Sequence, residues 1–208
     1  MNTYLPVKTI LIGGSFAGCP HQGHFELIKM ASRAGDKVLL FVSAGDRQKN
    51  KDEAKIHAED SRTIWENCVM DYLPVNVDVI FCSSPIRQIY GFLGKMNENG
   101  SWDNFEVWGS DDLEDNFPNL AREKYFGTLH KSGRLKFKPI SRHETCPISG
   151  SQMRTLLAKG MKNEFLSFLP DEICSEHNKI WEILHGRFMR EENPNPEAMT
   201  KDFIYRMR

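Results

Sequence analysis

Short apolar runs alternate with helical apolar patterns along the first half of the chain. The apolar runs are typical of buried strands, and they lie at residues 8–12, 37–42, 75–81, 105–108 and 135–137. Helical periodicity follows the first three runs, at residues 23–34, 56–71 and 85–96. Strands that alternate with helices form parallel sheets covered by helices on both faces. The pattern therefore predicts an α/β fold with a parallel sheet.

From Ser149 onward the pattern is helical, with breaks at Gly160 and Pro170. We therefore expect one main domain over residues 1–170 and a helical C-terminal extension over residues 171–208. The last stretch, residues 191–208, begins with the turn-rich sequence ENPNP, so we expect a loosely attached tail there.

The overall composition argues against several classes of function. The chain has 208 residues with 27 basic and 28 acidic side chains, and this balance argues against a general nucleic-acid-coating role. Its five cysteines are scattered and form no CxxC pair, which indicates reduced thiols rather than a zinc site or a disulfide framework. Neither a membrane-spanning apolar run nor a signal peptide is apparent, so we expect a cytoplasmic protein.

The loops after the strands are where chemistry is expected. In open parallel sheets, ligands bind beyond the carboxyl ends of the strands. The corresponding loops here span residues 13–24, 43–55, 83–87 and 109–113.

The first of these loops carries the sequence GGSFAGCPHQGH, residues 13–24, between a strand and a helix. Small residues such as Gly13, Gly14 and Gly23 let a backbone approach a ligand closely. A helix N-terminus offers unpaired N–H groups that suit a phosphate. His21 and His24 are three residues apart, which places both imidazoles on one helical face, where they can stabilise charge that develops on phosphate oxygens. The alternative is a glycine-rich turn with two exposed histidines.

A second candidate is the sequence ISGSQMR, residues 148–154. Ser149 or Ser151 can cap the helix that begins there and leave groups available to an anion. Arg154 lies about one turn further on and can reach the same phosphate as a bidentate donor. Taken alone, the segment is better explained as an ordinary Ser-capped helix with a solvated arginine. Paired with the HQGH sequence, the anion-binding interpretation is favoured.

Weaker candidates lie in the other loops. The sequence GSDDL begins at Gly109, and its Asp111 or Asp112 either bonds a nucleotide hydroxyl or caps a helix. The candidates for binding the acceptor are Ser43, Lys55, Trp65 and Arg87. Lys55 belongs to a basic loop that also carries Arg47, Lys49 and Lys51, and Arg87 follows the third strand. A charge run is usually a solvated face, and the favoured interpretation of Trp65 is a core residue.

With HQGH after the first strand and ISGSQMR about 125 residues later, the chain resembles the HxGH nucleotidyltransferase superfamily over roughly residues 8–170. The resemblance implies a Rossmann-like sheet, with ATP lying over the helix that begins at HQGH and Mg²⁺ accompanying the triphosphate. It implies phosphate contacts from His21, His24 and Arg154. The ATP-binding set that we expect comprises Gly13, Gly14, Ser15, Phe16, Gly23, Gly109, Asp111, Ile148, Ser149, Gly150 and Ser151. Members of this superfamily often assemble into homo-oligomers, and the sequence alone does not specify the oligomeric state of this chain.

Two details refine the resemblance. Phe16 and His21 are separated by one residue more than in the family pattern, so the loop over residues 17–20 should differ locally. GSDDL resembles the GADxL segment of nicotinamide mononucleotide adenylyltransferases, which favours transfer of AMP from ATP to nicotinamide mononucleotide, giving NAD and pyrophosphate. A cytidylyltransferase, a phosphopantetheine adenylyltransferase and a non-catalytic nucleotide-binding protein are the alternatives.

Overall fold

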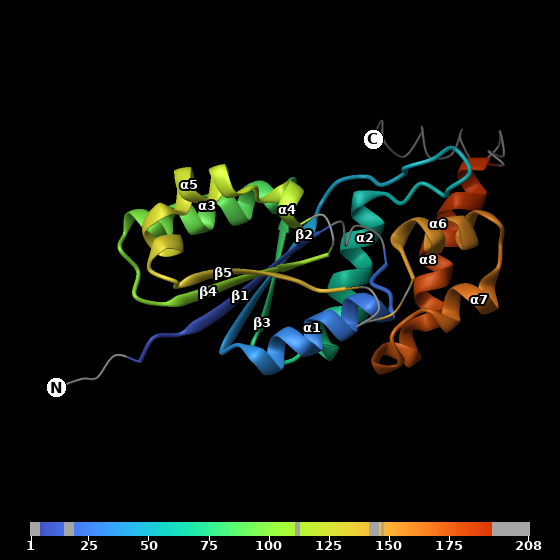
Figure 1. The fold of residues 1–208 in the computed structure, drawn as a ribbon. Coiled ribbons are helices and arrows are strands. Elements are labelled where there is room, and N and C mark those ends of the chain that lie inside the picture. The colour runs from blue at the N-terminus through green and yellow to red at the C-terminus, as the bar shows by residue number, and fades with distance from the viewer. Residues whose placement is uncertain (1–4, 15–18, 111–112, 142–145, 147, 193–208) are drawn as a thin grey trace, which may run out of the picture.

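A five-stranded parallel sheet forms the centre of the protein (Figure 1). The computed structural model describes residues 5–14, 19–110, 113–141, 146 and 148–192. The strands are β1 (Lys8–Gly14), β2 (Lys37–Ser43), β3 (Val77–Cys82), β4 (Asn104–Gly109) and β5 (Leu135–Pro139). Their order is β3-β2-β1-β4-β5, and each neighbouring pair is parallel. All five predicted strands are confirmed, and the fold is a Rossmann-like α/β fold.

The strand order reverses at β1. From β1 the chain moves outward through β2 to β3, and it then crosses back to place β4 on the other side of β1. The helices that follow β1 and β4 therefore cover opposite faces of the sheet, and the carboxyl ends of strands at such a point are the usual ligand position in these folds. This topological switch point places the glycines at the end of β1 and Gly109 at the end of β4 on neighbouring strands.

Helices cover the two faces of the sheet (Figure 1). One face carries α1 (Gln22–Ala34), α2 (Ala58–Ile64) and the C-terminal helices α6 (Gly150–Ala158), α7 (Lys162–Ser167) and α8 (His177–Glu192). The other face carries α3 (Pro85–Glu98), α4 (Leu113–Asn116) and α5 (Asn119–Lys131). Side chains alternate along β1 accordingly, because Ile10 and Ile12 join the core under α1 while Leu11 joins the core under α3.

The C-terminal helices share the core of the first face. In Figure 1 α6, α7 and α8 lie together beside α2, and a 3₁₀ segment, η4 (Asp171–Glu176), lies between α7 and α8 in the chain. Ile180, Trp181 and Leu184 of α8 are buried in the same cluster as Phe25 of α1. Arg187 Nε also lies 2.7 Å from Asp60 Oδ2, which ties α8 to α2. Among the described residues, no helix is both long and apolar enough to cross a membrane.

The second predicted helix, residues 56–71, is not one regular α-helix. After α2 it continues as a π-helical turn, η1 (Trp65–Val69), and a 3₁₀ turn, η2 (Met70–Tyr72). The wider turn lets the adjacent residues Cys68 and Val69 both enter the core. The Lys179 ammonium of α8 donates to the Asn67 carbonyl at 3.2 Å, so this carbonyl of the π-helical turn has a hydrogen-bond donor.

Helix α5 was not predicted, because its inward face does not follow an apolar pattern. Its buried positions are Arg122, Phe126 and Leu129, so a charged residue occupies the first of them. The Arg122 guanidinium lies over the Phe137 ring at 4.0 Å and pairs with Glu114 at 2.7 Å. These contacts satisfy a charge that would otherwise be costly to bury.

Asn76 joins the end of α1 to the start of β3. Its side-chain nitrogen donates to the carbonyls of Ser32 at 2.9 Å and Gly35 at 3.0 Å. Its side-chain oxygen accepts from the Ser32 hydroxyl at 2.6 Å. The last carbonyls of a helix have no intrahelical hydrogen-bond donor, and the Asn76 side chain supplies donors to two carbonyls at the end of α1.

We predict that Asn76→Ala lowers the free energy of unfolding by about 2 kcal/mol, because it leaves two partly buried carbonyls without their donor. Urea denaturation followed by circular dichroism measures this. Asp78→Ala is the matched control, since Asp78 is exposed two residues away and should change stability by no more than about 0.5 kcal/mol. Equal effects of the two substitutions would contradict the role given to Asn76.

Candidate functional site

Two histidines occupy the N-terminus of α1, beyond the carboxyl end of β1. His21 is the N-cap residue and His24 is the third residue of the helix. Their rings stack with centroids 3.6 Å apart and an interplanar angle of 22°, so the expected placement on one face is confirmed. The His21 backbone N–H donates to His24 Nδ1 at 3.4 Å. Because Nδ1 accepts this bond, the proton of a neutral His24 ring is assigned to Nε2.

Gly23 packs tightly between these histidines and the segment before α6. A Cβ atom at this position would lie 2.9 Å from the Cys146 carbonyl oxygen and 3.3 Å from the His21 ring. The backbone N–H of Gln22 donates to the Phe168 carbonyl at 2.8 Å. The HQGH sequence is therefore held from two sides, by the segment that leads into α6 and by the segment that follows α7.

The glycines that end β1 and β4 contact neighbouring helices. A Cβ at Gly13 would lie 2.6 Å from Ile89 and 3.4 Å from Pro85, at the start of α3. A Cβ at Gly109 would lie 2.9 Å from the Leu113 side chain. The absence of side chains thus serves helix packing at these positions. Gly14 ends β1, while three other expected ATP contacts, Ser15, Phe16 and Asp111, lie outside the described residues.

Helix α6 begins with a capping box. Ser149 is the N-cap residue, its hydroxyl accepts from the Gln152 backbone at 3.2 Å, and Gln152 Oε1 accepts from the Ser149 backbone N–H at 2.8 Å. This confirms the predicted serine cap. Ile148 is buried in the core just before it, which fixes where the helix begins. The segment before α6 contacts the first turn of α1, because a Cβ atom at Gly23 would lie 2.9 Å from the Cys146 carbonyl oxygen.

Arg154 is buried against this first turn and is not a solvated side chain. It is 6% exposed, and its Nη2 donates to the Ser151 hydroxyl at 3.1 Å. A Cβ at Gly150 would lie 3.3 Å from Nη1, so Gly150 leaves room for the guanidinium. Among the described residues, Nη1 has no hydrogen-bond partner. The Arg154 Nε donates to Glu53 Oε2 at 2.8 Å.

Glu53 is the partner that the sequence did not indicate. Its side chain is 1% exposed, and it accepts from the Lys49 backbone at 3.0 Å and from the Asn50 amide at 2.8 Å. Burial by itself raises the pKa of Glu53, but the Arg154 guanidinium, the Lys49 N–H, the Ser151 hydroxyl and the Asn50 amide together lower the pKa to about 2. Glu53 is therefore an anion at neutral pH.

The loop after β2 is built around this carboxylate. Arg47 and Ile56 pair as an antiparallel bridge that closes the loop, and the Gln48 side chain donates to the Glu53 carbonyl at 2.9 Å. The Ala54 backbone N–H donates to the Arg154 carbonyl at 3.2 Å. The basic side chains of this loop, Arg47, Lys49, Lys51 and Lys55, are exposed, as expected of a solvated face. The loop backbone is closed by the Arg47–Ile56 bridge and attached to α6 through Ala54.

The weaker acceptor candidates are dispersed. Ser43 is buried at the end of β2, and Arg87 is exposed in the first turn of α3, whose Pro85 abuts Gly13. Trp65 is fully buried in the core, so its side chain has no surface to offer an acceptor, in agreement with the interpretation favoured from sequence. Lys55 pairs with Asp46 at 2.9 Å.

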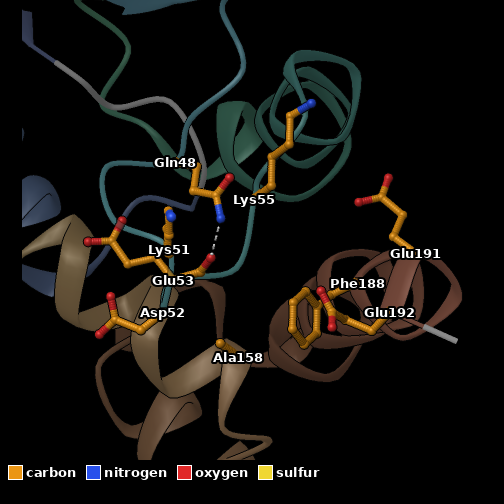
Figure 2. A pocket seen from close by; sticks show the side chains of 9 residues that line it. All are labelled: Gln48, Lys51, Asp52, Glu53, Lys55, Ala158, Phe188, Glu191 and Glu192. Atoms are coloured by element: carbon orange, nitrogen blue, oxygen red, sulfur yellow. Dashed lines mark hydrogen bonds between the residues drawn. The ribbon is translucent and has the colours of Figure 1, made fainter.

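Lys55 also lines a separate cavity of about 400 Å³, which lies between the loop after β2 and the end of α8 (Figure 2). The other lining residues are Gln48, Lys51, Asp52, Glu53, Ala158, Phe188, Glu191 and Glu192. Five of the nine lining side chains are both exposed and charged, namely Lys51, Asp52, Lys55, Glu191 and Glu192. In Figure 2, Phe188 and Glu192 face Asp52 and Ala158 across the opening.

The first turns of α1 and α6 together are suited to an anion. Each contributes backbone N–H groups and the positive end of a helix dipole, and Arg154 adds a guanidinium. The described residues contain no group of three or more His, Cys, Asp or Glu side chains that could hold a metal ion.

Comparison with known proteins assigns no family. No protein-family model matches the chain, and no curated protein sequence matches it. The chain is similar to a solved structure of Thermotoga maritima TmcAL bound with alpha-thio ATP, with a TM-score of 0.44 and 15% sequence identity. The match covers 91% of this chain and 56% of that chain. A likeness at this level carries no argument about activity.

We predict that the Glu53 carboxylate contributes about 3 kcal/mol to the free energy of unfolding at neutral pH, because its pKa falls from 4.5 to about 2 on folding. A lowered pKa gives stability that is complete above pH 4.5 and is lost as the pH falls toward 2. Urea denaturation between pH 7 and pH 3 should therefore show a smaller loss in Glu53→Gln than in the natural protein.

Asp52→Asn is the control for this pH series, because Asp52 is an exposed carboxylate next to Glu53 in the same loop. It should keep the pH dependence of the natural protein. A Glu53→Gln protein that loses stability with falling pH as steeply as the natural protein would show that Glu53 is not the group responsible.

Proposed function

We propose that this protein is a nucleotidyltransferase that transfers AMP from ATP to the phosphate of a small-molecule acceptor and releases pyrophosphate. The observation that carries the proposal is the stacked pair His21 and His24 at the N-terminus of α1, directly beyond the central strand β1. This is the position beside the switch point where a ligand of such a sheet is expected. The pair matches the HxGH sequence of the superfamily.

The second half of the proposed triphosphate site is the first turn of α6. The Cys146 carbonyl packs against Gly23, so the segment that leads into α6 lies beside the first turn of α1. Arg154 and the capped N-terminus of α6 supply donors for the β- and γ-phosphates. His24 Nε2–H and the His21 ring would contact the α-phosphate, where charge develops during transfer.

The reaction needs no covalent bond to the protein. An oxygen of the acceptor phosphate attacks the α-phosphorus of ATP in line. The bond from the α-phosphorus to the oxygen that bridges it to the β-phosphorus breaks, and pyrophosphate leaves with that oxygen and its electron pair. The protein contributes orientation and neutralisation of charge. Mg²⁺ would enter with the triphosphate, as part of the substrate.

The proposed acceptor is nicotinamide mononucleotide, with NAD as the product. Its support is the GSDDL sequence that follows β4, which resembles the corresponding segment of nicotinamide mononucleotide adenylyltransferases. Gly109 begins this segment at the end of β4, next to β1. The first turn of α3, which carries Arg87, packs against Gly13 at the end of β1, the strand that neighbours β4.

We predict that the purified protein releases pyrophosphate from ATP with nicotinamide mononucleotide, and that His24→Asn lowers kcat/KM by about a hundredfold or more, because a donor to the developing charge is lost. A coupled pyrophosphate assay measures both. His130→Asn is the matched control, since His130 lies near the end of α5, next to the start of β5, and should retain full turnover.

The same assay separates the alternatives. Release with CTP in place of ATP, or with phosphopantetheine as the acceptor, would keep the mechanism and replace the substrates. Tight ATP binding without pyrophosphate release from any phosphorylated acceptor would mean a non-catalytic nucleotide-binding protein. Full turnover by His24→Asn would contradict the proposed role of the histidine pair.

A further inference from the structure

The contact between Glu53 and Arg154 fixes one end of the arginine's guanidinium. Glu53 Oε2 takes the Nε–H of Arg154 at 2.8 Å, and both side chains are almost completely buried. Arginine has five N–H donors in a fixed fork, and Nε is the one nearest the side-chain stem. A carboxylate at Nε holds the plane of the guanidinium while leaving its terminal nitrogens for another acceptor.

Those terminal nitrogens lie at the first turn of α6. Nη2 contacts the Ser151 hydroxyl, and Nη1 lies next to the position where Gly150 lacks a side chain. Gly150 and Ser151 are the first two residues of the helix, so the fork lies beside the end whose backbone N–H groups attract anions. The arginine is thus oriented toward the site that we assign to the triphosphate.

Glu53 is itself held by the loop that carries it. Its two carboxylate oxygens accept from the backbone of Lys49 and the side chain of Asn50, and the loop is closed by the pairing of Arg47 with Ile56. The carboxylate therefore has few alternative positions. A group held this firmly can orient a long, flexible side chain such as Arg154 before a ligand arrives.

We propose that Glu53 is a positioning residue for ATP, acting through Arg154. This inference rests on the proposed function, because it assumes that Arg154 contacts the triphosphate. It assigns a specific task to the loop after β2, which is to hold the Arg154 fork at the first turn of α6.

The direction in which ATP affinity changes when the Glu53 charge is removed distinguishes a positioning role from a purely electrostatic one. A negative charge close to a triphosphate repels it, so removing the Glu53 charge should strengthen ATP binding if charge alone matters. If Glu53 positions Arg154, removing its charge should weaken ATP binding instead. A purely structural role predicts a less stable protein whose affinity for ATP is unchanged.

The test is the Kd of α,β-methylene-ATP with Mg²⁺, measured by isothermal titration calorimetry at a temperature where each variant is folded. Glu53→Gln should weaken binding by about tenfold or more, because the charge-assisted bond that orients the fork is lost. Asp52→Asn removes the same charge from the adjacent, exposed position and should stay within about twofold of the natural protein.

Two further proteins show whether Glu53 acts through Arg154. Arg154→Lys keeps the charge but has no fork to position, so adding Glu53→Gln to it should cost no further affinity. Glu53→Asp keeps the charge and shortens the side chain by one methylene, so it should weaken binding even if Glu53→Gln does not fold.

The outcomes distinguish the two proposals. A natural protein that does not bind the nucleotide overturns the proposed function and this inference with it. A natural protein that binds, with Glu53→Gln and Glu53→Asp binding equally well or more tightly, overturns the positioning role alone. Full additivity of Glu53→Gln and Arg154→Lys would also overturn it.

Discussion

The pairing of β1 with both β2 and β4 is the constraint on which the site depends. Backbone hydrogen bonds join β1 to a strand on each side, so its end is fixed in the middle of the sheet. Its side chains are buried on both faces, with Ile10 and Ile12 on one and Leu11 on the other. A one-residue shift of β1 would move Ile10 and Ile12 into the core under α3 and Leu11 into the core under α1, which would disrupt the packing of both cores. The positions of the glycines that end β1 and of the start of the helix that follows are therefore fixed.

Two sets of contacts fix the proposed phosphate site relative to the end of β1. Gly23 and Gln22 hold the first turn of α1 between the segments around Cys146 and Phe168, so the histidine pair is placed by neighbours on both sides. The buried pair of Glu53 and Arg154 then joins the loop after β2 to α6. Breaking such a pair would leave one uncompensated buried charge, which makes the link between the two segments costly to open. The proposed phosphate site thus has little freedom to rearrange.

Apolar runs were enough to predict the five strands. The signal is strongest for β1 and β2, which are buried on both faces, and weaker for the edge strands β3 and β5, which are partly exposed. Periodicity does not specify hydrogen-bond register, so the π-helical turn at Trp65 could not be predicted. The helix that contains Arg122 was missed because a charged residue occupies a buried position whose partners lie elsewhere in the chain.

Some features of the candidate site could likewise be predicted from sequence, and others could not. The histidine spacing and the Ser149 cap are local features, and both were predicted from sequence. Glu53 was missed because it lies in a charge-rich loop 101 residues from Arg154, and no pattern in one sequence joins positions that far apart. The sequence singled out Gly13 for close approach of a ligand, and the structure shows a further requirement at this position, contact with Ile89 and Pro85 of α3 that leaves no room for a side chain.

The central claim is that the triphosphate of ATP lies against the histidine pair at the start of α1. Nuclear magnetic resonance of ¹⁵N-labelled histidine side chains during titration with α,β-methylene-ATP and Mg²⁺ tests it most directly. The account predicts that the His21 and His24 imidazole signals shift together and saturate at one nucleotide concentration, while those of His130 and His185 stay in place. Saturable nucleotide binding that leaves the His21 and His24 signals unchanged would contradict it.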